Sequence, residues 1–378
     1  MNLVSNFDPA LTRICVLDYY PFEQRIPLFF ESDLDKIKND QNKTVITTYN
    51  FTGYPILKPH IEDFLIYRLK NNLQTVVIYD FSFESHLQDQ DIDIILSYFQ
   101  NLGLDIEKQL LILNNNWENS DERSYTYTYD VWAVDAYYWL NTKPEKFTTL
   151  PLAKRPALSN LVLSKLKQKK SRAKIAYEFY KKNLLNRCLL SVMGDLQEFS
   201  EVIRDQEFLE EIDQRITHIG GAPVQYVEGK SNIEFMCETS NRTLFNNSVL
   251  SCVLETSFSE KTDDITSWKG IGFLTEKFYR CIVNKTPFII YGKPGLIQQV
   301  KEKNFDDFGS IIDLSFDEIH DEDLKIEKYV QEVETFLDNF SNRINEIQAI
   351  CDHNYEVFLN HATAEYKYYQ DRISNFLN

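Results

Sequence analysis

The spacing of apolar residues in the first 150 positions predicts strands that alternate with helices. Continuous apolar or β-branched runs predict strands at residues 44–48, 75–79 and 110–113. Apolar residues three or four positions apart predict helices at 60–71 and 92–102, and Gly103 ends the second of them. This alternation predicts a parallel α/β sheet, in which ligands lie outside the carboxyl ends of the strands.

The same alternation continues in the second half of the chain. Apolar runs predict strands at residues 161–163, 189–192, 248–254 and 288–291. Helical spacing predicts helices over 173–183, over much of 195–215, after Thr275, over 296–303 and from Asp321 onwards. We therefore expect a second α/β sheet and a long helical C-terminus.

A proline-containing segment divides the two halves. Residues 141–160 contain Pro144, Pro151 and Pro156 and show little periodicity, which indicates a linker. We expect an N-terminal α/β domain over 1–150, a second α/β domain over 151–345 and a C-terminal helix over 346–378. A chain of 378 residues is long enough to give two such domains full-sized cores.

Composition predicts a soluble protein of the reducing cytoplasm. The six cysteines form no close pair, and no apolar run reaches about 18 residues. We therefore expect no membrane partner. The net charge of −17 argues against nucleic-acid binding through the overall field, although eight basic residues and one acidic residue lie between Lys165 and Lys182.

The start of the helix after Thr275 is the strongest candidate for chemistry. Thr275 is placed to cap that helix. Glu276 and Lys277 fall in the first turn, where free N–H groups and the positive end of the helix dipole favour anions. A lysine there can bind a phosphate, and a glutamate can accept hydrogen bonds from sugar hydroxyls. The alternative is that Glu276 only complements the dipole and Lys277 is solvated.

The residues around this helix start resemble a known donor-binding stretch. The run FLTEKF ending at Phe278, followed by PFIIYG ending at Gly292, resembles the donor-binding stretch of fucosyltransferase-type glycosyltransferases of the GT-B fold. It is also similar to uncharacterised glycosyltransferase-like proteins of phages and large viruses, which carry a turn like that at Asn304-Phe305. The resemblance implies that Glu276 and Lys277 contact a nucleotide sugar, with Thr275 and Gly292 in the same stretch.

The resemblance also implies an architecture and a separate role for each domain. It implies two Rossmann-like domains facing a cleft, with a C-terminal helix that crosses back to the first domain. The second domain would bind the nucleotide sugar, and the first would supply the acceptor site and a base. Enzymes of this kind generally need no metal in the donor site, because helix dipoles and basic side chains offset the diphosphate charge.

Three further residues are candidates for the donor site. Lys169 and Arg172 belong to a basic run between a predicted strand and a predicted helix, which suits a diphosphate. A solvated basic surface, or a patch for an acidic partner, is the alternative. Glu255 directly follows the predicted strand 248–254. It could hold a ribose or sugar hydroxyl, or make a structural hydrogen bond to the next loop.

A general base is expected in the first domain. A sugar transfer that inverts configuration needs a group that takes the proton of the acceptor hydroxyl. Asp80 directly follows the clearest strand of the first half, and Glu84 lies in the loop beyond it. Both would lie at the ligand edge of a parallel sheet. The alternative is that Asp80 only caps the loop, a common use of aspartate after a strand.

Metal and cofactor sites are not expected. The Asp-X-Asp patterns at Asp89, Asp91 and Asp93 fall at a helix start, and the six histidines show no ligand spacing. We expect a metal-independent glycosyltransferase that uses a nucleotide sugar as co-substrate and a hydroxyl acceptor. The alternatives are a phage-type enzyme acting on hydroxymethylated DNA in an infected host cell, and a non-catalytic protein that binds nucleotide sugars or glycans.

Overall fold

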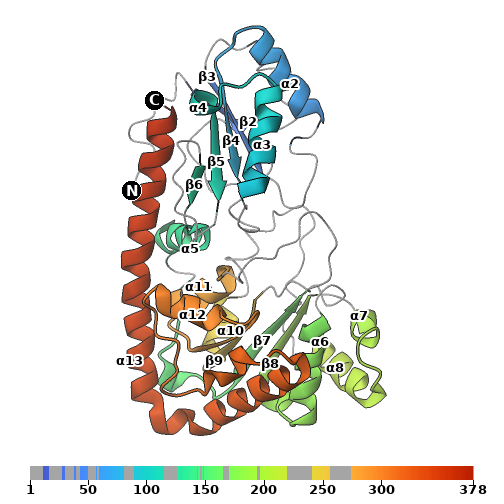
Figure 1. Ribbon diagram of the computed structural model, residues 1–378. Coiled ribbons are helices and arrows are strands. Elements are labelled where there is room, and N and C mark those ends of the chain that lie inside the picture. The colour runs from blue at the N-terminus through green and yellow to red at the C-terminus, as the bar shows by residue number, and fades with distance from the viewer. Residues whose placement is uncertain are drawn as a thin grey trace. The chain divides into compact units, whose positions relative to one another are not determined.

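The structure is a computed structural model whose chain divides into two units. It describes residues 12–16, 28–29, 38–39, 43–49, 57, 59–80, 89–114, 126–128, 130–142, 144, 147, 149–164, 170–193, 196–218, 241–255 and 274–377. The first unit contains Met1–Asp135, Asp263–Gly270 and Ala362–Asn378, and the second contains Ala136–Thr262 and Ile271–His361. Each unit is built on a parallel sheet with helices around it (Figure 1). The predicted boundary at residue 150 and the predicted cleft stay predictions.

The sheet of the first unit has six described strands, all parallel. They are β1 (Thr12–Val16), β2 (Leu28–Phe29), β3 (Lys43–Tyr49), β4 (Thr75–Asp80), β5 (Leu110–Asn114) and β6 (Thr126–Thr128). Their order across the sheet is β2-β1-β3-β4-β5-β6. Asp80 is the last residue of β4 and pairs with Tyr49 of β3 and Leu113 of β5.

The first half of the chain contains four described helices, of which the sequence predicts the first two. These helices are α2 (Pro59–Lys70), α3 (Asp89–Asn101), α4 (Ile106–Gln109) and α5 (Val131–Thr142). Leu65 of α2 and Phe99 of α3 are fully buried in one cluster with Val77 and Ile112 of the sheet. Gly103 has a φ of 94°, which lets the chain turn after α3 because glycine adopts positive φ without strain.

The sheet of the second unit has four described strands, also all parallel. They are β7 (Ser159–Ser164), β8 (Cys188–Met193), β9 (Leu250–Leu254) and β10 (Phe288–Tyr291), in the order β10-β9-β7-β8. From β7 the chain adds β8 on one side and then β9 on the other. The strand order therefore reverses between β7 and β9, and a point of reversal is where open α/β sheets place their ligands.

The helices of the second unit include both helices that the donor motif predicts. In chain order they are α6 (Lys170–Lys181), α7 (Leu196–Ser200), α8 (Gln206–His218), α10 (Asn241–Asn246), α11 (Glu276–Val283) and α12 (Leu296–Glu302), with short 3₁₀ turns at Leu152–Lys154, Leu185–Arg187 and Leu314–Glu318. The fully buried ring of Phe278 in α11 packs edge-on against Tyr279, Phe288 and Phe305, with centroids 5.0–5.2 Å apart. Burying each such ring stabilises the fold by about 1.5–3 kcal/mol.

A single helix, α13, runs from Glu322 to Leu377. Its first part buries Ile326, Val330, Val333 and Leu337, a spacing of four and three that gives one apolar stripe. Its residues from Ala362 onward belong to the first unit. Among the helices described, none combines the length and apolarity needed to cross a bilayer.

The structure confirms the α/β class, the parallel sheets and the long C-terminal helix, and corrects three local expectations. Helix α6 begins at Lys170, so Arg172 lies in its first turn and not in a loop. Asp80 belongs to β4 and does not follow it. Helix α3 begins at Asp89, ahead of the predicted start at residue 92, because its acidic first turn is helical as well.

Candidate functional site

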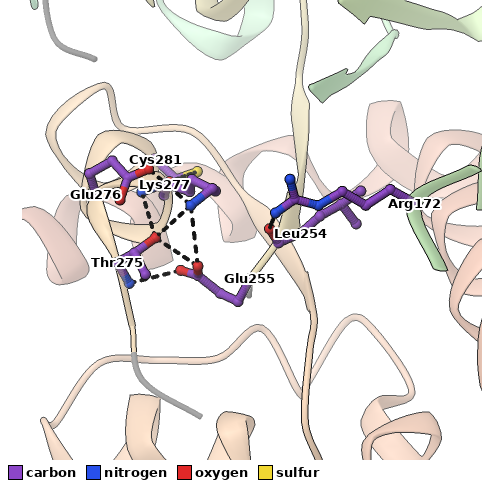
Figure 2. A network of polar contacts seen from close by, with 7 residues as sticks. All are labelled: Arg172, Leu254, Glu255, Thr275, Glu276, Lys277 and Cys281. Carbon is purple, nitrogen blue, oxygen red and sulfur yellow. Dashed lines mark hydrogen bonds and ion pairs between the residues drawn. The ribbon is translucent and has the colours of Figure 1, made fainter. Parts of the chain in front are cut away.

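A group of charged side chains gathers where the strand order of the second unit reverses. Glu255 directly follows β9, and its N–H bonds the carbonyl of Tyr291 at the end of β10 (2.9 Å). Arg172 lies in the first turn of α6, which follows β7, the strand next to β9. Thr275, Glu276 and Lys277 complete the group from the start of α11 (Figure 2).

Thr275 caps α11, as its sequence position predicts. Its backbone is extended and its Oγ1 accepts a hydrogen bond from the backbone N–H of Lys277 (3.3 Å). The N–H of Thr275 donates to Glu255 Oε1 (2.8 Å). The N–H groups of Phe278 and Tyr279 donate to the carbonyl of Thr275. The first turn therefore satisfies most of its own donors, and charged side chains remain to bind a ligand.

Glu255 joins the end of β9 to the start of α11. Besides the N–H of Thr275, its carboxylate accepts a hydrogen bond from Thr275 Oγ1 at Oε2 (2.6 Å). The carboxylate is almost fully buried. A carboxylate offers about four acceptor sites, so two of them are free of Thr275. Of the two roles that the sequence left open, the structural bond to the following segment is present, with acceptor capacity to spare.

Lys277 folds back over this cap (Figure 2). Its Nζ donates to Thr275 Oγ1 (3.0 Å) and to Glu276 Oε1 (2.9 Å), and lies 3.7 Å from Glu255 Oε2. The side chain of Lys277 is 29% exposed, against 2% for Glu255 and 9% for Glu276. Lys277 is thus the member of this trio that an approaching ligand meets first, with the two carboxylates behind it.

The pKa values of the two carboxylates, Glu255 and Glu276, are shifted in opposite directions. Burial raises the pKa of Glu255, and Glu276 raises it further, against the opposing effect of Lys277. Burial also raises the pKa of Glu276, but Lys277 and Arg280 outweigh burial and hold that pKa below its ordinary value. Of the two carboxylates, Glu255 is therefore the one whose protonated form its surroundings favour more.

Arg172 adds a second positive charge near the carboxylates. It comes from α6, which follows β7, whereas Glu255 follows the neighbouring strand β9. One of its terminal nitrogens donates to the carbonyl of Leu254, the last residue of β9 (3.0 Å). Burial lowers the pKa of Arg172, and the charges of Glu255 and Glu276 partly offset that effect. Arginine remains charged under such conditions, so the site holds Arg172 and Lys277 as cations beside the carboxylates.

Gly292 lies directly beside this group, where the sequence motif places it. A methyl group added there would stand 2.7 Å from Cδ2 of Leu296 and 3.4 Å from Cβ of Glu255. A side chain at this position would therefore require the buried side chain of Leu296 to shift. The motif therefore has a packing reason at Gly292 in addition to any ligand.

A buried ion pair that the sequence did not reveal lies next to the turn at Gly292. Lys325 of α13 donates from Nζ to the carbonyl of Gly292 (2.9 Å) and pairs with Asp317 (3.3 Å). Asp317 in turn accepts bonds from the N–H groups of Gly295 and Ile297 at the start of α12. The only sequence signal was one lysine at an apolar position of an otherwise acidic helix.

The remaining site candidates lie elsewhere or outside the described residues. Asp80 ends β4 in the first unit, at the carboxyl edge of its sheet, and the structure describes only its backbone. Glu84 and Lys169 lie outside the described residues. The donor candidates Glu255, Thr275, Glu276, Lys277, Arg172 and Gly292 all come together in the second unit.

Three of the five basic residues that the structure describes between Lys165 and Lys182 are paired or buried. Lys174 pairs with Glu322 and Asp323, and Lys181 pairs with Glu178. Arg172 is buried. Lys170 is exposed, so part of the run still faces solvent.

No group of metal-ligating side chains was found among the described residues.

Comparisons with known proteins yield structural likenesses only. No protein-family model and no curated protein matches the sequence. The fold is similar to an alpha,alpha-trehalose 6-phosphate synthase from Burkholderia multivorans, with a TM-score of 0.41, 11% identity and coverage of 89% of this chain and 71% of that one.

Two further solved structures show likenesses of the same size. The alpha,alpha-trehalose-phosphate synthase (UDP-forming) from Burkholderia vietnamiensis gives a TM-score of 0.37 and 11% identity over 88% of this chain and 72% of that one. The enzyme of the same name from Burkholderia xenovorans, in complex with glucose-6-phosphate, gives a TM-score of 0.40 and 9% identity over 89% of this chain and 74% of that one. Likenesses at these values do not tell what this chain binds.

Proposed function

We propose that this protein is a glycosyltransferase that moves a sugar from a nucleotide-sugar donor to a hydroxyl acceptor. The observation that carries the proposal is the group of Glu255, Glu276, Lys277 and Arg172 at the reversal of strand order in the second sheet. Parallel α/β sheets bind their ligands at this place. The resemblance of the sequence around Thr275 to a donor-binding stretch supports the same assignment.

The side chains suit the two halves of such a donor. Lys277 is partly exposed and can bind a diphosphate as a point charge, with Arg172 adding positive potential behind it. Glu255 and Glu276 have acceptor capacity left for ribose or sugar hydroxyls. In this arrangement basic side chains offset the diphosphate charge, which is the basis for proposing metal-independent transfer.

The two alternatives receive different support. A DNA-modifying enzyme needs a free basic surface, and three of the five described residues of the basic run are paired or buried. Retention on DNA at low salt, lost steeply as salt rises, would revive that alternative. A non-catalytic nucleotide-sugar-binding protein would share the donor site. Donor binding without release of nucleoside diphosphate in the presence of any hydroxyl acceptor would favour it.

A nucleoside diphosphate is expected to stabilise the fold. A ligand at about 100 times its Kd adds about 2.7 kcal/mol, which raises Tm by roughly 5–10 °C for a unit of this size. The test is thermal unfolding with UDP, GDP, ADP, CDP and TDP at millimolar concentration, with sulfate at the same ionic strength as the control. If none of the five raises Tm more than sulfate does, the donor site does not exist.

Removing the ammonium of Lys277 is expected to weaken that binding. Lys277→Ala should cost about 1.5–3 kcal/mol, the range for a hydrogen bond to a charged group, or roughly 10- to 150-fold in Kd. Glu276→Gln should alter discrimination between sugars or riboses more than phosphate affinity. Calorimetry measures both variants, and Lys328→Ala, at an exposed position of α13, is the matched control. Normal nucleotide binding by Lys277→Ala would contradict the assignment.

A further inference from the structure

The donor site contains two buried carboxylates and one accessible ammonium that serves both. Lys277 Nζ hydrogen-bonds Glu276 and lies 3.7 Å from Glu255, and both carboxylates are less than one-tenth exposed. An anion that binds Lys277 therefore competes with them for the same positive charge. When the ammonium turns toward an anion, the negative charges of the two buried carboxylates are less well balanced, which costs free energy. Protonation of one carboxylate removes that cost.

The hydroxyl of Thr275 links the two carboxylates to the lysine. A threonine hydroxyl has one donor and two acceptor sites. In the structure it donates to Glu255 Oε2 and accepts from the backbone N–H and the Nζ of Lys277, so all three are in use. Glu255 can donate a proton of its own to this oxygen only when one acceptor site is vacated. Departure of Lys277 Nζ vacates that site.

We propose that binding of a phosphate anion at Lys277 is coupled to the uptake of one proton by Glu255, through the hydroxyl of Thr275. This inference rests on the proposed donor site. In the coupled step Lys277 Nζ leaves Thr275 Oγ1 for the anion, and a proton from solvent binds Glu255 Oε2. That O–H donates to Thr275 Oγ1, and the Thr275 hydroxyl proton turns to Glu276, which is also within its hydrogen-bonding reach.

The groups that face Glu255 make it the one that takes the proton. From α11 these are Lys277, Glu276 and the thiol of Cys281, and from α6 it is Arg172. Burial and Glu276 already favour the protonated form of Glu255, and Lys277 is the main group that opposes it. The charge of Arg280 still lowers the pKa of Glu276 when Lys277 turns away, so this pKa stays lower than that of Glu255.

The sign of the pH dependence follows from this coupling. A bound anion raises the pKa of Glu255 above its value in the free protein. Binding is therefore tightest below the free-protein pKa and weakens as pH rises through the pKa of the complex. Between these two values Kd should rise by up to about tenfold per pH unit.

Calorimetry tests the coupling directly. Nucleoside diphosphate and, separately, inorganic pyrophosphate are titrated into the full chain in two buffers of the same pH but different ionisation enthalpies. The difference in heat gives the number of protons taken up. Wild type should take up more protons per bound anion than Glu255→Gln, by up to about one. The ligand's own phosphate ionisation is the same in both proteins and cancels. Equal uptake in the two proteins overturns the proposal.

A second measurement without ligand covers the case in which Glu255→Gln does not fold. Lys277→Met imitates the departure of the ammonium, so the pKa of Glu255 should rise further in the folded protein. The folded state then binds more protons than the unfolded state above the ordinary glutamate pKa, and stability falls as pH rises. The free energy of unfolding of Lys277→Met should therefore fall more steeply with pH than that of wild type. Parallel curves overturn the proposal.

The outcomes separate this inference from the proposed function. Nucleotide binding with no extra proton uptake leaves the donor site standing and removes the coupling. Pyrophosphate binding with extra uptake, but no nucleotide binding, supports the coupling and removes the nucleotide donor. If neither anion binds, both are wrong.

Discussion

Replacing Lys325 by methionine is expected to lower the free energy of unfolding of the second unit by about 3 kcal/mol. Lys325 and Asp317 are 5% and 7% exposed, so removing the lysine leaves a buried carboxylate without its cation. The expected loss is at the low end for broken buried pairs, because Asp317 keeps its bonds to the N–H groups of Gly295 and Ile297. The carbonyl of Gly292 also loses its donor. Urea unfolding followed by circular dichroism measures the change.

The chain provides a matched control for this prediction. Lys174 pairs with Glu322 and Asp323 at the exposed start of the same helix. Lys174→Met should cost less than about 1 kcal/mol, since exposed pairs contribute little. Adding Asp317→Asn to Lys325→Met should recover part of the loss, because asparagine can still accept the two backbone bonds without a charge. Equal losses from Lys325→Met and Lys174→Met would show that the buried pair is not the reason.

Replacing Asp80 by asparagine is expected to lower turnover about 10²- to 10⁴-fold, the usual cost of removing a general base. Asp80 ends β4 between β3 and β5, at the edge where a parallel sheet presents its ligands. Asparagine keeps the shape of the side chain but cannot take the acceptor's proton. Donor affinity should be unchanged, because every described donor candidate lies in the second unit.

Release of nucleoside diphosphate from the nucleotide sugar measures this effect, first with water and then with a panel of hydroxyl acceptors. Asp93→Asn, at an exposed position of α3, should leave the rate unchanged. Glu84→Gln tests the second candidate. If Asp80→Asn and Glu84→Gln both turn over at a near-normal rate, neither is the base, and a retaining reaction or a base elsewhere follows.

Local signals in the sequence were enough to predict most of the second unit. The run Phe288–Tyr291 is a strand with the predicted bounds, because Pro287 and Gly292 bracket four apolar residues. Thr275 caps α11 because capping depends only on the residues of that first turn. Element ends set by charged residues were less predictable. Lys170, Ser171 and Arg172 looked like a loop, yet tertiary packing makes them the first turn of α6.

The contacts within the site could not be predicted, because they join residues far apart in the sequence. Glu255 could be placed after a strand, but its two bonds to Thr275 depend on β9 and α11 being neighbours in space. The orientation of Lys277 toward Glu276 and Thr275 follows from the same neighbourhood. The pair of Lys325 and Asp317 was missed altogether, since a single lysine at an apolar position of α13 does not identify a partner that precedes the helix.

The division of the chain has a consequence for its biosynthesis. The first unit is made of the start of the chain together with Ala362–Asn378. Within that unit Glu365 accepts a hydrogen bond from the backbone N–H of Asp130 (3.1 Å). A nascent chain that has emerged only as far as Asp135 lacks this helical segment, so the first unit cannot be completed before residues 362–377 have been made. Until then its unfinished surface is available to chaperones and proteases.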